Sequence, residues 1–416
     1  MLEQETLKTK KFDLLNPSTR ANPYPLYEQL RKEEPVHWSE ELHGWVLTRY
    51  EDVMAALHDQ RLSPGGGFAA MFTRLNDDVR AETEPLQRHF SMWLGTLDPP
   101  DHTRVRTLMN KAFTPRLVEL MRPFIQTVTD ELIDNVQQTG RMDIVSDLSV
   151  PLPAIVIAQM LGTPREDYER FIHWSLSISN LIGDACATPE IVRNAQQSVL
   201  EMTDHLRALL ERRRHSPPQN DLINNFILAE GQENRISEEE VLANCVMLLF
   251  AGHGTITVMI GTHLLVLLQN PDVLETLRRD PSLTPSAIEE MLRFDSPCQM
   301  IRRVATENVE INDTLIREGE LVWLHLGAAN RDEGHCPFPD KLDISRRPPG
   351  HLGYGASIHY CLGAALSRIE TEIAINTILR RLPDVRLESD ELDWHPDPTA
   401  RALKSLRVVF TPVKVS

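Results

Sequence analysis

The segment that decides the fold is His351-Leu-Gly-Tyr-Gly-Ala-Ser-Ile-His-Tyr-Cys361-Leu-Gly-Ala-Ala-Leu-Ser-Arg-Ile-Glu370. Its first half contains Gly353, Gly355 and Ser357, which are residue types that favour tight turns. Apolar residues then recur at helical spacing, at positions 362, 366, 369, 373, 379 and 382. The sequence therefore predicts a loop followed by a helix that begins at Cys361 or just after it.

A cysteine at the start of a helix has a distinct chemistry. The free amides and the dipole of the helix N-terminus favour the thiolate form of Cys361. A thiolate is a strong ligand for iron and donates electron density to whatever binds on the opposite side. A lone cysteine is more often a small buried apolar residue, so the neighbouring residues decide between the two interpretations.

The neighbours resemble the haem-binding loop of the cytochrome P450 family, whose pattern is loosely F-G-x-G-x-H-x-C-x-G. The matching residues are Gly355, His359, Cys361 and Gly363. Tyr354 replaces the usual Phe, and Ser357 replaces the second Gly, which predicts a strained or shifted turn. The resemblance implies that the cofactor is haem b (heme b, iron protoporphyrin IX), with the Cys361 thiolate as axial iron ligand and Gly363 beside it.

Further segments resemble motifs of the same family, in the family's order, and the resemblance runs from about Asn22 to the C-terminus. These segments are Asp98–Arg106, Ala251–Thr255, Glu290–Arg293 and Arg303–Ala305. The resemblance implies charge-assisted hydrogen bonds to the two haem carboxylates from His102, Arg106, Arg303 and His359. Taken singly, each of these four residues is more often a surface charge.

Glu290 and Arg293 stand three residues apart, where a surface pair contributes a few tenths of a kcal/mol. In the family this pair is buried and structural, and an arginine from a following meander completes it. Lys341 stands where that arginine is usual. A lysine cannot make a bidentate contact, which puts the third contact of the network in question.

A second feature is a long helix predicted over about residues 237–270, most of which carries no charged side chain. Ser237 and Glu240 form a capping box, and Pro271 predicts the end of the helix. Residues 241–268 contain no Asp, Glu, Lys or Arg, and an apolar run of this length can span a membrane. One Asn and two His interrupt the run, however, and no Trp or Tyr belt flanks it. We therefore expect a helix through the middle of a large core, and no membrane anchor.

The centre of this helix reads Ala251-Gly252-His253-Gly254-Thr255. Each mid-helix glycine costs about 1 kcal/mol relative to alanine, which indicates either close approach of another group or a local break in the helix. The resemblance implies that Gly252, Gly254 and Thr255 belong to the catalytic, oxygen-binding side of the haem. Thr255 can turn its hydroxyl toward a ligand, or it can bond back to its own helix, which is common.

The family usually has an acidic residue immediately before this threonine, and the two residues help to deliver protons to the bound oxygen. Gly254 occupies that position here. Water can replace the acid, the substrate can supply a polar group, or the protein can use peroxide or perform a less usual oxidation. His253 is adjacent, but one residue is about 100° around a helix, so we expect it to point elsewhere.

The composition indicates a folded protein in a reducing compartment. Of the 416 residues, 41% are apolar and 25% are charged, which are ordinary globular values. The five cysteines are odd in number and form no C-x-x-C pair, which disfavours a disulfide framework. The first residues contain no apolar core of a signal peptide. We therefore expect a cytoplasmic protein.

We expect a single domain over residues 1–416, mainly α-helical with small β-sheets, in a cytochrome P450-like fold. The β-containing regions are expected near residues 35–50, 300–326 and 385–413. Two stretches, Ser63–Trp93 and Ser177–Thr188, are expected to be irregular loops.

The net charge of −17 argues against nucleic acid as the main partner. Residues 101–122 nevertheless carry five Lys or Arg against two acids, a local net charge of +3. The resemblance implies electrons from a ferredoxin or flavodoxin with its reductase. This basic stretch is either a docking patch for such an acidic partner or simply the solvated face of a helix.

The sequence thus favours a haem-thiolate monooxygenase that inserts one oxygen atom of O2 into a lipophilic small molecule, by hydroxylation or epoxidation, in secondary metabolism. By family analogy the pocket is lined by the two irregular stretches, Met247, Phe250 and Pro297–Ile301, which are mostly apolar. A second hypothesis keeps the haem but assigns a peroxide-using or otherwise atypical enzyme, because of Gly254. A third is a helical binding or membrane-associated protein without haem, which rests only on the apolar helix.

Overall fold

The computed structural model describes residues 12–73, 75–183, 188–219, 221–229, 236–346 and 350–413. The α-helices are α1 (Tyr24–Glu33), α2 (Tyr50–His58), α3 (Pro64–Phe72), α4 (Asp77–Glu82), α5 (Glu84–Phe90), α6 (Asp101–Ala112), α7 (Pro115–Leu120), α8 (Arg122–Asp134), α9 (Pro151–Met160), α10 (Tyr168–Gly183), α11 (Pro189–Arg214), α12 (Leu222–Ala229), α13 (Glu238–Gln269), α14 (Pro271–Arg279), α15 (Thr284–Phe294), α16 (Leu326–Ala329) and α17 (Ala364–Arg381). The strands are β1 (Val36–Ser39), β2 (Gly44–Leu47), β3 (Leu62–Ser63), β4 (Arg141–Asp143), β5 (Ile301–Ala305), β6 (Val309–Ile311), β7 (Thr314–Ile316), β8 (Leu321–Leu324), β9 (Arg386–Leu387), β10 (Asp393–Trp394), β11 (Leu403–Ser405) and β12 (Arg407–Val409).

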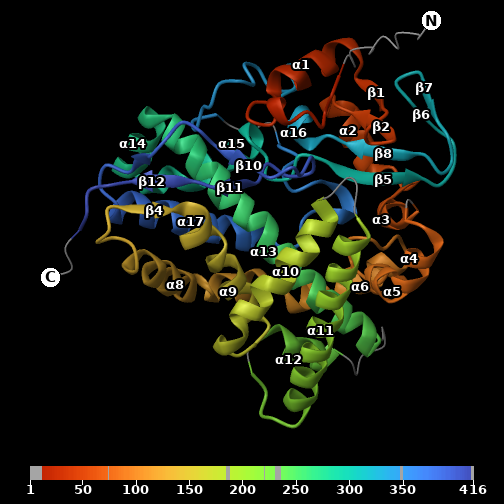
Figure 1. Ribbon diagram of the computed structural model, residues 1–416, viewed down its shortest axis with the longest axis horizontal. Helices are drawn as coiled ribbons and strands as arrows, with labels where there is room; N and C mark the ends of the chain where they lie inside the picture. Colours follow the sequence, from red (N-terminus) through yellow and green to blue (C-terminus); the bar gives the residue numbers. More distant parts are fainter. Residues whose placement is uncertain are drawn as a thin grey trace, which may run out of the picture.

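Helix α13 runs through the middle of the molecule (Figure 1) and packs against α9, α10, α11, α14, α15 and α17. Among the described residues it is the one helix long and apolar enough to cross a membrane, and 61% of its most apolar window is buried by the rest of the protein. A helix that is apolar on all sides and packed on all sides belongs to a protein core. The predicted core helix and the mainly α fold class are confirmed.

The ends of α13 also follow the prediction. The Ser237 hydroxyl accepts a hydrogen bond from the Glu240 amide at 3.2 Å, and the Glu240 carboxylate accepts one from the Ser237 amide at 2.8 Å. The helix ends at Gln269, and α14 begins at Pro271. The capping box satisfies amides at the start of the helix that have no partner within it.

The glycines of α13 do not break it, since the helix is continuous from Glu238 to Gln269. A Cβ atom at Gly252 would lie 3.0 Å from the Ile157 side chain of α9. Close approach of a neighbouring helix therefore explains Gly252, and the alternative of a local break is wrong.

A five-stranded sheet lies beside α1 and α2, in the order β1-β2-β8-β5-β3 (Figure 1). Strands β2 and β8 are parallel, whereas the other neighbours are antiparallel. The smaller sheets are β4-β12-β9, β10-β11 and β6-β7. Strand β5 is important for the site because it carries Arg303.

The predicted loop over Ser63–Trp93 is wrong, because this stretch forms α3, α4 and α5. Ser63 caps α3 by accepting a hydrogen bond from the Gly66 amide at 3.3 Å. A Cβ atom at Gly66 would lie 2.8 Å from Val304, and one at Gly67 would lie 2.8 Å from Arg302. The glycines therefore let α3 pack closely on β5 and do not mark a loop.

The predicted loop over Ser177–Thr188 is wrong for its first part. Helix α10 continues to Gly183, and Ile178 and Leu181 are fully buried. Those two apolar residues keep the helix on the core despite the small polar residues between them. Thr188 caps α11. Residues 184–187, which include Cys186, lie outside the described residues.

Candidate active site

Cys361 lies in the loop before α17, close to its first residue, Ala364. The Cys361 amide donates a hydrogen bond to the Tyr354 carbonyl oxygen at 3.0 Å, which closes the loop. Gly355 has φ 67° and Ser357 has φ 61°. This left-handed conformation is free for glycine but costs about 1–2 kcal/mol for other residues. The strained turn predicted from Ser357 is therefore present.

The surroundings of Cys361 favour ligand chemistry. Its side chain is exposed, yet burial raises the pKa of its thiol. The thiol therefore has accessible surface, although protein atoms surround it closely enough to remove much of its hydration. The backbone amides of Gly363 and Ala364 and the charges of Arg106 and Arg368 act in the opposite direction and lower that pKa. These groups stabilise a thiolate.

The other described cysteines have different environments. Cys245 and Cys336 are buried, and Cys298 is half-buried. Burial raises the pKa of the thiols of Cys245 and Cys298 to about 12. Neutral, enclosed thiols of this kind are inert, so Cys361 is the described cysteine that fits an iron ligand.

Four cationic or titratable side chains gather near this cysteine. They are His102 and Arg106 of α6, Arg303 of β5 and His359 of the short helix η5 (Ser357–His359). The His102 and His359 rings lie 4.3 Å apart between centroids. Burial, followed by the charges of His102, Arg303 and Arg106, lowers the pKa of His359 to about 3. The structure thus brings together four residues that the sequence placed in three separate motifs.

Among the described residues no carboxylate forms an ion pair with this cluster, although the charge of Asp98 acts on His102 and Arg303. His102 is 2% exposed, and neither of its ring nitrogens has a hydrogen-bond partner among the described residues. Arg303 is 7% exposed, and its Nη1 donates to the Arg302 carbonyl oxygen at 2.9 Å. Burial lowers the pKa of Arg303 to about 10, although Asp98 partly opposes this. Buried donors without partners are costly, so the cluster fits an anionic group such as the two carboxylates of the haem predicted from the sequence.

One face of α13 is exposed near the middle of the helix, whereas the adjacent faces are buried. Ala251 and Thr255, one turn apart, are exposed, whereas His253 and Ile256 between and beside them are buried. The Thr255 hydroxyl donates to the Ala251 carbonyl oxygen at 2.9 Å, so the back-bonded arrangement is the observed one. A hydroxyl that donates in this way can still accept a hydrogen bond from a ligand or a water molecule.

His253 points away from that open face. Its Nε2 lies 3.0 Å from the Val150 carbonyl oxygen and its Nδ1 lies 2.9 Å from the Ser175 hydroxyl. A carbonyl can only accept, so Nε2 carries the hydrogen and Nδ1 accepts from Ser175. Burial lowers the pKa of His253 to about 4, so the ring is neutral. The expectation that His253 points elsewhere is confirmed.

Another residue occupies the space beside Gly254. A Cβ atom at Gly254 would lie 3.1 Å from the Ser179 hydroxyl of α10. That hydroxyl donates to the Ser175 carbonyl oxygen at 2.9 Å. The Ser179 hydroxyl therefore lies against Gly254, on the side where another residue would carry its side chain. The sequence did not predict this contact because Ser179 lies 75 residues away.

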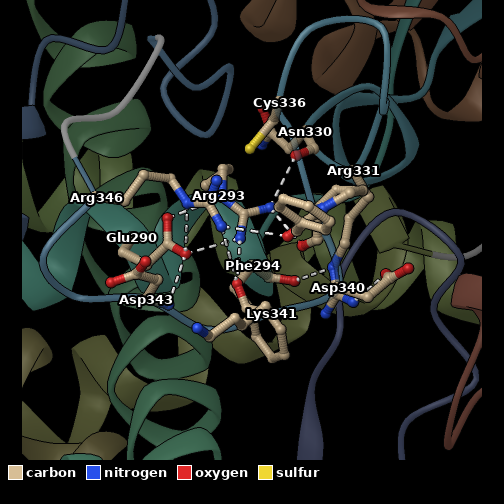
Figure 2. A network of polar contacts seen from close by, with 12 residues as sticks. Glu290, Arg293, Phe294, Asn330, Arg331, Cys336, Asp340, Lys341, Asp343 and Arg346 are labelled. Atoms are coloured by element: carbon tan, nitrogen blue, oxygen red, sulfur yellow. Dashed lines mark hydrogen bonds and ion pairs between the residues drawn. The ribbon is translucent and has the colours of Figure 1, made fainter.

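The Glu290–Arg293 pair is buried, with both side chains 1% exposed. Arg293 donates to the Glu290 carboxylate through Nε and Nη2, each at 2.8 Å. Its Nη1 donates to the Pro339 carbonyl oxygen at 2.8 Å. The pair therefore anchors α15 to the segment that leads to the cysteine loop (Figure 2).

Arg346, not Lys341, completes this network. Arg346 Nε lies 3.3 Å from Glu290 Oε1, and Figure 2 shows both guanidinium groups joined to Glu290. Lys341 contributes its backbone carbonyl oxygen, which accepts from Arg293 at 3.2 Å and from Arg346 at 3.3 Å. The third contact of the network, which Lys341 had put in question, is therefore made by Arg346. The sequence could have indicated this, because Arg346 is a second basic residue five positions after Lys341.

The sequence was compared with known families and proteins. The cytochrome P450 family model matches residues 87–400. The chain is 37% identical to "Cytochrome P450 CYP107DY1" of Priestia megaterium, over 96% of this chain and 98% of that protein. It is also 37% identical to the "Vitamin D(3) 25-hydroxylase" of Pseudonocardia autotrophica, over 98% of each chain.

The fold was compared with solved structures. A crystal structure of P450BioI in complex with acyl carrier protein carrying hexadec-9Z-enoic acid superposes with a TM-score of 0.87. That chain is 36% identical, and the match covers 94% of this chain and all of that one. The similarity therefore extends over the whole site described above.

Proposed function

The chain belongs to the cytochrome P450 family and is a P450 monooxygenase with haem as cofactor, and from this we propose that it inserts one oxygen atom of O2 into a lipophilic small molecule. The reaction is a hydroxylation or an epoxidation in secondary metabolism, in the cytoplasm. The observation that supports this most directly is the exposed Cys361 thiol near Arg106 and near a buried His102 whose ring nitrogens have no hydrogen-bond partner among the described residues.

Each residue of the site has a role in this proposal. Haem, when bound, supplies the redox chemistry that activates oxygen. Cys361 is its iron ligand, with Gly363 beside the sulfur. The residues that bind the haem carboxylates are His102, Arg106, Arg303 and His359.

The residues of α13 have other roles: Gly252 lets α9 approach, Gly254 leaves room for Ser179, and Thr255 holds a ligand or a water molecule. Glu290 and Arg293 are structural.

The decisive experiment is the absorption spectrum of the purified protein after reduction and exposure to carbon monoxide. The proposal predicts the red-shifted Soret band that only thiolate ligation produces. A band at the position typical of histidine or thiol ligation, in undamaged protein, would contradict the assignment of Cys361. A protein that binds no haem would contradict the whole proposal.

The lining expected for the substrate pocket supports a lipophilic substrate. Phe68 of α3, Trp93 and Phe250 of α13 form an aromatic cluster, with Trp93 stacked on Phe250 at 5.6 Å and Phe68 edge-on to Trp93 at 6.4 Å. Relatives named for vitamin D(3) hydroxylation and for an acyl chain on a carrier protein are consistent with this chemistry. Spectral titration with secosteroids and fatty acids tests it, and exclusive binding of small charged molecules would contradict it.

The replacement Gly254→Glu is expected to change the share of reductant that ends in product, because it restores a proton-carrying group beside Thr255. Its Cβ must displace the Ser179 hydroxyl, so the variant is best made together with Ser179→Ala. Product and hydrogen peroxide are measured per reductant consumed, with Gly261→Ala on the same helix as control. We expect several-fold less peroxide release. Unchanged coupling would mean that the absent acid has no mechanistic importance here.

Gly254 also supports a second candidate, a peroxide-using or otherwise atypical haem-thiolate enzyme. The residue immediately before Thr255 on α13 carries no carboxylate. Turnover with hydrogen peroxide but not with a ferredoxin system would favour this candidate, and the reverse result would favour the monooxygenase reaction.

Electrons come from a redox partner, which we propose to be a ferredoxin or flavodoxin with its reductase. The basic stretch over residues 101–122 attracts an acidic partner less strongly than its net charge of +3 predicts, because Arg104 is paired with Glu240 and Arg122 with Glu372. We expect the rate of reduction by an acidic ferredoxin to fall moderately with rising ionic strength. Stopped-flow reduction measures this rate, and a salt-independent rate would exclude the stretch as a docking patch.

A further inference from the structure

Glu289 of α15 contacts both ends of the segment that carries Cys361. Its Oε2 lies 3.1 Å from His351 Nε2, before the cysteine. Beyond the cysteine, on α17, Arg368 donates to the same carboxylate through Nε at 2.6 Å and Nη2 at 3.0 Å. One side chain thus joins the beginning of the loop to the helix that follows it.

Both contacts of Glu289 are directed hydrogen bonds. His351 Nδ1 lies 3.1 Å from the Gly353 amide, which can only donate. Nδ1 therefore accepts, and Nε2 carries the hydrogen that is donated to Glu289. Burial raises the pKa of Glu289, but the hydrogen bonds from His351 and Arg368 outweigh it and lower the pKa to about 2. Glu289 is therefore an anion in the working protein.

Arg368 is held against a residue of the cysteine loop. Its guanidinium carbon lies 4.4 Å from the centre of the Tyr354 ring, a cation–π distance. Tyr354 is fixed in turn by a hydrogen bond between its hydroxyl and Ser367 at 2.8 Å, and its carbonyl oxygen accepts from the Cys361 amide. A chain of contacts thus runs from Glu289 through Arg368 and Tyr354 to the backbone of Cys361.

We propose that Glu289 and Arg368 form a positioning pair for Cys361. Glu289 holds the Arg368 guanidinium over Tyr354, whose carbonyl oxygen fixes the Cys361 amide, and holds the entry of the loop through His351. The pair thereby adjusts how much electron density the sulfur donates to the iron, and hence the reduction potential of the haem. This inference rests on the proposed role of Cys361 as the iron ligand.

The test compares Glu289→Gln and Arg368→Gln in the full-length holoenzyme. Glutamine in place of Glu289 carries no charge, and its single carbonyl oxygen can accept at most two of the three hydrogen bonds that the carboxylate accepts. We expect Arg368→Gln to lower the reduction potential, because a cation near the sulfur is lost. Glu289→Gln is expected to raise it, because the anion that compensates Arg368 is lost. Each shift should change the ferric-to-ferrous ratio at a fixed potential several-fold.

Two further variants separate positioning from simple support of the fold. Arg368→Lys keeps the charge, so it should retain most of the original potential. Asp130→Asn removes an ion pair with Arg381 at 2.9 Å, at the end of α17 that lies opposite the cysteine loop, and should leave the potential unchanged. Equal melting temperatures of these variants would show that they are comparably folded.

The outcomes are distinct. Shifts in the same direction for Glu289→Gln and Arg368→Gln, or no shift in either, would overturn the positioning pair. An unmodified protein without the thiolate-type carbon monoxide band would instead reject Cys361 as the ligand, and with it the proposed function.

Discussion

Cys361→Ser is expected to abolish the red-shifted carbon monoxide band and to reduce oxygenation to background. A serine hydroxyl is far less acidic than a thiol, so it cannot supply a thiolate ligand. The amides of Gly363 and Ala364, and the charge of Arg368, would then face a neutral group. Difference spectra and product formation with a reductant system measure both losses.

The control is Cys298→Ser. Cys298 is half-buried, and burial raises the pKa of its thiol to about 12, so its replacement should keep the band. A Cys361→Ser protein with an unchanged band would show that another cysteine binds the iron. The expected result is a Cys361→Ser protein that still binds haem but lacks the red-shifted band.

Glu290→Ala is expected to lower the free energy of unfolding by about 3–5 kcal/mol, since removing one partner leaves buried charge uncompensated. Arg293 is 1% exposed and would lose both of its carboxylate contacts, while Arg346 would lose its contact with Glu290. Urea unfolding of the holoenzyme, followed by haem absorption and far-ultraviolet circular dichroism, measures the change.

Matched variants test how the network is assembled. Arg346→Ala should destabilise the protein more than Lys341→Ala, because Lys341 contributes only its backbone carbonyl oxygen. Glu372→Ala, which removes a partly exposed pair with Arg122, should cost about 0–1 kcal/mol. An equal loss for Arg346→Ala and Lys341→Ala would contradict the network described for Glu290.

The sequence predicted the local elements well where a short pattern carries the information. The capping box at Ser237 and Glu240 and the stop at Pro271 set the limits of α13, because they depend on residues within one turn of each other. The strained turn at Ser357 follows from a side chain in a position that favours glycine. The cysteine motif was recognised because its residues are contiguous.

The stretches that sequence analysis misjudged depend on distant partners. The loop predicted over Ser63–Trp93 is wrong because the small size of Gly66 and Gly67 serves the packing of α3 on β5, which lies more than 200 residues further along the chain. The polar residues after Ser177 predicted a loop where the last part of α10 continues, because Ile178 and Leu181 of that part are buried in the core. Composition within a window cannot report a contact that a distant strand or helix makes.

The sequence by itself determined the fold class, the central helix and the cysteine that can bind iron, because these depend on local periodicity, capping and a contiguous motif. Only the tertiary structure decided which side chains meet. It gave Glu290 its third contact in Arg346, placed the Ser179 hydroxyl beside Gly254, and joined both ends of the cysteine segment through Glu289. These contacts arise when elements distant in sequence pack together, and the geometry of hydrogen bonds then selects one partner among several of the same chemical type.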